Sequence, residues 1–212
     1  MSSILSILRN NSDFLTKVFL NLILQLIITS ITIYFLKGVD ISALGFFFLF
    51  IITLIIMSLI IFLNIPIVYK VVLFAIFSIC FGIMMSPVYK IDKEILMSSI
   101  FGTLAIFLVF FIFGLIITYY GYNISWISGI LLMSLFVLII TGILSLCFKI
   151  STVTKKIYLY FGLLIFSLYI LLDTNQILLN KRYGQDFVSA SMGYYLDIIN
   201  IFMKLLQLFN GK

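Results

Sequence analysis

The stretches that decide the fold are FGLLIFSLYILLDTNQILL at residues 161–179 and SASMGYYLDIINIFMKLLQLF at residues 189–209. Each is apolar enough for a membrane helix, yet each carries an aspartate well inside it, Asp173 or Asp197. A carboxylate at mid-depth in a bilayer costs about 2.5–3.5 kcal/mol, and such residues usually face the bundle interior and serve a function. Each aspartate is therefore the obvious partner of the other. The remaining acidic residues lie at the ends of apolar runs or between them: Asp13, Asp40, Asp92, Glu94 and Asp186.

Composition places the whole chain in a membrane. Of its 212 residues, 64% are hydrophobic and 9% are charged, and no soluble domain of this size carries so little charge. We therefore expect one multi-spanning membrane domain over residues 1–212, with the lipid bilayer as its main partner. The first apolar run is expected to act as an uncleaved insertion signal. The net charge of +6 is scattered, which suits loops beside anionic headgroups and excludes a nucleic-acid role.

The residue inventory also limits the chemistry. The chain has no histidine and two cysteines, Cys80 and Cys147, both within apolar runs. A zinc site and a histidine-based catalytic triad are thereby excluded. We expect both thiols to be free and buried, and we expect neither a bound cofactor nor enzymatic activity.

Hydropathy resolves the chain into seven segments, each near the length of about 20 residues that a helix needs to cross hydrocarbon. Short connections separate them, and lipid admits only helices or closed barrels. The predicted fold is an all-α seven-helix membrane bundle, with the C-terminal helix surrounded by the others because its polar face would otherwise meet lipid. The expected segments are 15–36, 43–63, 67–88, 95–119, 125–148, 157–179 and 189–209.

Polar residues form a stripe on each of the last two segments. Helical spacing aligns Tyr169, Asp173, Gln176 and Asn180 on one, and Gly193, Asp197, Asn200, Lys204 and Gln207 on the other. Because polar stripes in lipid should face each other, we expect the two helices to pair. The aspartates are 24 residues apart across a short polar turn, so an antiparallel pair can bring them to a similar depth.

Two carboxyl groups in contact at low dielectric should share one proton. Protonated, they would hold the helices together; fully ionised, they would repel or admit a cation such as calcium. Two carboxylates alone make a poor calcium site, so binding at Asp173 and Asp197 is expected to be weak and transient. A proton-sensitive latch and a permanent hydrogen-bonded clasp both remain open. Lys204 lies two turns from Asp197, and the length of its stem favours snorkelling to the headgroups over direct pairing.

The same residues carry a family resemblance. The segments FSLYILLDTNQIL and YYLDIINIFMKLLQLF resemble the C-terminal motifs of the Bax inhibitor-1 family, also called Lifeguard or transmembrane Bax-inhibitor-motif proteins. The opening FLTKVFLNLILQLIIT is similar to the first span of that family, and the middle matches more loosely.

The resemblance implies six helices wrapped around a central C-terminal one. It also implies a pH-sensitive calcium leak channel with Asp173 and Asp197 as the sensor. Calcium and protons would be the permeant and regulatory ions. In a eukaryotic or viral member, suppression of cell death, possible cell-death regulators as partners, and an endoplasmic reticulum or Golgi membrane would follow. In a bacterial member the membrane would be the inner or plasma membrane.

The chain also departs from the family pattern. Some members carry an arginine at the end of the second helix that pairs with the first aspartate. This chain has Asn64 near that position, and its only arginines are Arg9 and Arg182. An arginine-locked closed state is therefore not expected here, and the acidic residue that many members have after the fourth helix is Asn123.

Three other functions use similar residues. A non-conducting membrane protein could inhibit apoptosis by binding partners through small-residue helix faces. An intramembrane aspartyl protease also needs two aspartates, but neither Asp173 nor Asp197 has a G-x-G-D-like flank. A proton-coupled transporter usually shows paired halves, and no internal repeat is visible in this chain.

Overall fold

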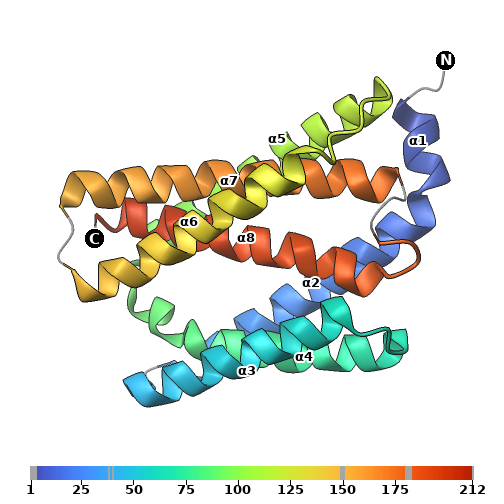
Figure 1. Cartoon of the computed structure of the whole chain (residues 1–212). Coiled ribbons are helices and arrows are strands. Elements are labelled where there is room, and N and C mark those ends of the chain that lie inside the picture. The colour runs from blue at the N-terminus through green and yellow to red at the C-terminus, as the bar shows by residue number, and fades with distance from the viewer. Residues whose placement is uncertain (1–3, 38, 40, 149–150, 180–182, 212) are drawn as a thin grey trace. The chain divides into compact units, whose positions relative to one another are not determined.

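The computed structural model describes residues 4–37, 39, 41–148, 151–179 and 183–211. In these residues the chain forms eight α-helices and one 3-10 helix, with no strand (Figure 1). The elements are α1 (Ile4–Asn10), α2 (Ser12–Phe35), α3 (Ala43–Phe62), α4 (Ile67–Met84), η1 (Ser86–Lys90), α5 (Lys93–Tyr119), α6 (Ile127–Cys147), α7 (Thr152–Leu178) and α8 (Phe187–Phe209).

The seven long helices confirm the all-α membrane architecture predicted from hydropathy. Within the described residues, six of them, α2 to α7, are long and apolar enough to cross a membrane. The seventh, α8, has 23 residues but interrupts its apolar sequence with polar ones such as Asp197, Asn200 and Lys204. The polar stripe that marked this helix in the sequence is thus what separates it from the other six.

Two of the differences between the expected and observed helix boundaries have local causes. The segment expected at 67–88 ends as an α-helix at Met84 and continues as η1, because Pro87 disfavours the α conformation at Ser86. The segment expected at 157–179 begins earlier, as α7 at Thr152, because Ser151 accepts a hydrogen bond from the Thr154 N–H at 3.1 Å and caps the helix. The short helix α1, ahead of the first span, was not predicted.

The chain divides into two compact units. Unit 2 contains residues 12–92 and 185–195, and so holds α2, α3, α4, η1 and the first part of α8. Within it, α4 packs against both α2 and α3. A Cβ atom at Gly82 of α4 would lie 2.7 Å from Thr32 Cβ and 2.9 Å from the Thr29 carbonyl oxygen of α2. Gly82 therefore permits the close α2–α4 approach expected of small residues.

Unit 1 contains residues 1–11, 93–184 and 196–212, which include α1, α5, α6, α7 and the rest of α8. Within it, α7 packs against α5 and α6. A Cβ at Gly114 of α5 would lie 2.6 Å from Thr174 Cβ of α7, and a Cβ at Gly102 would lie 3.0 Å from Leu205 Cδ1 of α8. Glycines on α5 thus bring both α7 and α8 close to it.

The helices differ sharply in exposure. The faces of α3 and α6 carry many exposed large apolar side chains, among them Phe47, Phe62, Met133 and Ile143, as expected of helices that face lipid. In α8, by contrast, no residue from Phe187 to Leu208 is exposed. The polar stripe of α8 is therefore buried, as the sequence predicted.

Candidate functional site

The predicted polar stripe of α7 lies in the most buried part of that helix. Asp173 is 3% exposed and Gln176 is buried, while Tyr169 is half-buried. Every residue from Leu172 to Leu178 is buried, so the end of α7 is enclosed on all sides. The fourth stripe residue, Asn180, lies outside the described residues.

Asn175 lies off this stripe and was not predicted as a site residue. Its amide nitrogen donates to Thr118 Oγ1 and to the Tyr122 carbonyl oxygen, both at 2.9 Å. Its amide oxygen accepts from the Ile124 N–H at 3.2 Å. Asn175 is fully buried and thereby fixes the turn between α5 and α6, whose Gly121 has a positive φ of 78°. Its position next to Thr174 and Gln176 in an apolar run was the available signal.

The stripe of α8 supplies the second carboxyl group. Asp197 is 5% exposed and belongs to unit 1 together with Asp173. Asn200 is half-buried, and its amide donates to the Leu196 carbonyl oxygen of the same helix at 2.8 Å. Asn200 therefore satisfies its amide locally.

Lys204 does not snorkel, and that prediction is wrong. The residue is 8% exposed, and its ammonium nitrogen lies 3.8 Å from the centre of the Tyr158 ring on α7. A Cβ at Gly162 would lie 2.6 Å from Lys204 Cε. Because Gly162 has no side chain, the lysine stem lies flat against α7 instead of extending outward.

The contact between Lys204 and Gly162 allows the positions of Asp173 and Asp197 along their helices to be compared. Seven residues separate Lys204 from Asp197, a rise of about 10.5 Å along a helix. In an antiparallel pair, the same rise along α7 leads from Gly162 to Tyr169, about one turn, or 6 Å, before Asp173. By this estimate the two buried acids lie about one helical turn apart along the helix axes, and their pairing through a shared proton stays a prediction.

A second set of buried polar side chains lies in unit 2 and was not predicted. Asn21 donates to Ser191 Oγ at 2.6 Å, Gln25 donates to Asn21 Oδ1 at 3.3 Å, and Ser78 donates to Gln25 Oε1 at 2.9 Å. Thr29 Oγ1 and the Tyr195 hydroxyl are 2.6 Å apart. All six residues are buried. These neutral groups on α2, α4 and α8 satisfy one another, as buried polar groups in lipid must.

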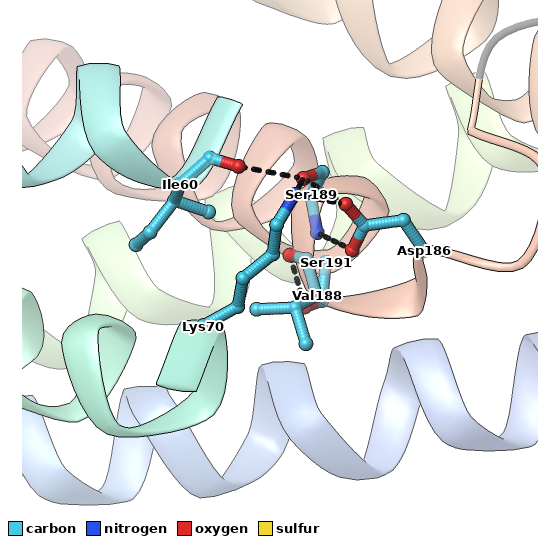
Figure 2. A network of polar contacts seen from close by, with 6 residues as sticks. All are labelled: Ile60, Lys70, Asp186, Val188, Ser189 and Ser191. Atoms are coloured by element: carbon cyan, nitrogen blue, oxygen red, sulfur yellow. Dashed lines mark hydrogen bonds and ion pairs between the residues drawn. The ribbon is translucent and has the colours of Figure 1, made fainter. Parts of the chain in front are cut away.

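Unit 2 also contains a buried ion pair that sequence reasoning missed (Figure 2). Lys70 of α4 binds Asp186 Oδ2 at 2.5 Å, and the side chains are 7% and 25% exposed. Asp186 also accepts from the Ser189 N–H at 3.0 Å and the Ser189 hydroxyl at 2.7 Å, which caps the first turn of α8. Burial raises the pKa of Asp186, but the hydrogen bonds from Lys70 and Ser189 and the lysine charge lower it further, so the net pKa lies below its usual value.

Asn64 occupies the loop between α3 and α4 and is exposed. It belongs to unit 2, whereas Asp173 belongs to unit 1. Among the described residues, no group of three or more cysteine, aspartate or glutamate side chains is placed to hold a metal ion. The candidate site therefore consists of Asp173 and Asp197 with Gln176 and Lys204 on the same two helices.

Parts of the chain are similar in sequence to known proteins of plants, viruses and yeast. The BI1-like protein of Arabidopsis thaliana is 33% identical over 89 residues, which are 42% of this chain and 34% of that protein. The Golgi anti-apoptotic protein of Vaccinia virus (strain Lister) is 41% identical over 75 residues, 35% of this chain and 31% of that protein. Bax inhibitor 1 of Schizosaccharomyces pombe is 35% identical over 88 residues, 41% of this chain and 32% of that protein.

Each of these alignments spans about a third of the relative's length. The family described as inhibitor of apoptosis-promoting Bax1 matches residues 11–212. That match includes every described helix from α2 onward and both aspartates. The chain therefore belongs to the Bax inhibitor family.

Proposed function

We propose that the protein is a pH-sensitive calcium leak channel, with Asp173 and Asp197 as its proton sensor and gate. The observation that carries the proposal is the burial of both carboxyl groups, 3% and 5% exposed, on helices of one compact unit. An acid inside a membrane protein is costly and is retained where it serves an ion or proton pathway. The activity is passive transport, so the proposal needs neither a cofactor nor a catalytic step.

The chemistry follows from the pairing of two acids. With one proton between them, the carboxyl groups form a hydrogen bond that holds α7 and α8 together. When the second proton leaves, two negative charges repel at low dielectric. A calcium ion then offsets that repulsion, because hard carboxylate oxygens are the ligands that calcium prefers. Two carboxylates bind it weakly enough for the ion to leave, and Gln176 adds a neutral oxygen on the same helix as Asp173.

The test is calcium flux into liposomes that contain the purified protein, measured at pH 6 and pH 8. Wild type should leak calcium at a rate that changes with pH. Asp173→Asn and Asp197→Asn should each flatten that dependence, because an amide keeps the shape but does not titrate. Asp13→Asn is the matched control, since the Asp13 side chain is 85% exposed on α2. A wild-type protein that conducts no calcium at either pH contradicts the proposal.

A second candidate is a non-conducting protein that suppresses cell death by binding partners in the membrane. The names of the viral and yeast relatives favour an anti-apoptotic role, and the viral relative is named for the Golgi. We propose the same role, in an internal membrane, if the host is eukaryotic or viral. Expression of wild type and Asp197→Asn in cells given a death stimulus separates the mechanisms. Equal protection by both proteins, with flux altered only in the variant, favours partner binding over calcium leak.

A further inference from the structure

Lys204 is a buried positive charge without a carboxylate partner in the described part of the chain. It is 8% exposed, and its ammonium group makes its contact with the face of the Tyr158 ring, 3.8 Å from the ring centre. A cation over an aromatic face recovers only part of what an ammonium loses on leaving water. A charge in this position is expensive, and apolar side chains of similar volume would fit the same space at lower cost.

Two glycines make room for this contact. A Cβ at Gly162 would lie 2.6 Å from Lys204 Cε and 3.5 Å from its Nζ. A Cβ at Gly142 of α6 would lie 3.1 Å from the Tyr158 hydroxyl oxygen. The lysine and the tyrosine are thus seated by small residues on α7 and α6. The inward position of the charge is a feature of the packing of unit 1.

The charge also stands on the same face of α8 as Asp197. Two turns of helix place it about 10 Å from that carboxyl group. At an effective dielectric of about 20, a unit charge at about 10 Å changes the occupancy of a monovalent cation roughly tenfold, and that of a divalent cation by the square of this factor. A cation held at the aspartate pair is therefore repelled by Lys204 in proportion to its own charge.

We propose that Lys204 is an electrostatic barrier that limits cation passage through unit 1 and disfavours divalent over monovalent ions. The inference rests on the proposed function, since it assigns a selectivity-setting residue to the same leak. This role explains why a positive charge is buried on the same helix as an acid of the proposed calcium pathway. The two aspartates attract the ion, and Lys204 keeps the leak slow.

The test compares calcium and potassium flux in liposomes for wild type, Lys204→Met and Lys204→Gln. The matched control is Lys156→Gln, which removes an exposed lysine from α7. With Lys204 neutral, potassium flux should rise about tenfold and calcium flux about a hundredfold, while Lys156→Gln should match wild type. Lys204→Met replaces a buried charge with an apolar side chain of similar size and is expected to fold. Lys204→Gln retains a polar head over the ring.

The changes in calcium flux and in potassium flux distinguish an electrostatic barrier from a structural role of Lys204. If Lys204 only holds the helices closed, its removal raises both fluxes by the same factor, and the proposal is overturned. Unchanged fluxes in both Lys204 variants, with a measurable wild-type leak, overturn it as well. No flux of either ion in wild type and in all variants contradicts the proposed function itself, which separates that failure from the failure of the barrier.

Discussion

Removal of the Asp186 charge should destabilise the protein more than removal of the Lys70 charge. Asp186→Asn leaves the ammonium of Lys70, whose side chain is 7% exposed, with neutral acceptors only, the new amide oxygen and Ser189 Oγ at 3.4 Å. Breaking a buried ion pair in this way costs about 3–5 kcal/mol. Because the Asp186 side chain is 25% exposed, water already screens part of the interaction. We therefore expect the lower end, about 3 kcal/mol.

Lys70→Met should cost less, because the carboxylate that remains is better supported. Asp186 would keep the Ser189 N–H at 3.0 Å and the Ser189 hydroxyl at 2.7 Å, and it stays partly in water. We expect a loss of about 1–2 kcal/mol. The double variant Lys70→Met/Asp186→Asn should be more stable than Asp186→Asn alone, since it leaves no unpaired buried charge.

The assay is reversible unfolding in mixed detergent micelles, followed by helical circular dichroism. Asp13→Asn is the control, because it breaks the exposed Lys17–Asp13 pair on α2 and should cost about 0.5 kcal/mol or less. The reasoning is refuted if Lys70→Met is the more damaging variant. It is also refuted if the two single losses simply add in the double variant.

The pH dependence of this pair follows from the sign of its pKa shift. The pKa of Asp186 is lowered from an ordinary value of 3.8. A lowered folded-state pKa gives stability that is present above the unfolded value and lost as the pH falls through the folded one. The stability difference between wild type and Asp186→Asn should therefore stay constant from about pH 8 to pH 5 and shrink only below about pH 4.

The remaining predictions concern packing and neutral hydrogen bonds, each measured as an unfolding free energy in the same micelles. Asn175→Leu should cost about 2–4 kcal/mol, because it leaves the backbone groups of the α5–α6 turn without their partner. Gly114→Ala should cost about 1–3 kcal/mol, since the new methyl group would meet α7 backbone at 2.9 Å, whereas Gly129→Ala meets nothing within 4 Å and should cost nothing. Tyr195→Phe should cost about 1–2 kcal/mol by removing a buried hydroxyl contact of 2.6 Å with α2.

The architecture was predictable because hydropathy alone separates the spans. Each long helix coincides with an apolar run, and the boundaries that differ have local causes. Pro87 ends α4 early, and Ser151 starts α7 early by capping Thr154. Pro87 and Ser151 each act on only a few residues, whereas the predicted boundaries were set by the hydropathy of the longer neighbouring sequence.

The ion pair could not be predicted from the sequence. Lys70 and Asp186 are 116 residues apart, and each stands near the edge of an apolar run, where a charge ordinarily faces the headgroups. The prediction for Lys204 was wrong for a related reason. A lysine stem is long enough to point outward or inward, and the choice depends on Gly162 of a different helix. Periodicity identifies the face of a helix but does not reveal what the opposite helix offers to it.

The buried polar groups of the two units differ in how they should respond to pH. We expect those of unit 2 to contribute to stability, and we propose that those of unit 1 regulate the leak. In unit 2 the groups are neutral except for the ion pair of Lys70 with Asp186, and the pKa of Asp186 lies below the range of mild acidification. Their hydrogen bonds should therefore persist between about pH 8 and pH 5. In unit 1, Asp173 and Asp197 are buried acids on α7 and α8, and the proposed sensor requires that their mutual repulsion depend on the protons they hold. Substitutions in unit 2 should thus shift stability equally at all pH values in this range, whereas Asp173→Asn and Asp197→Asn should change how the proposed calcium leak depends on pH.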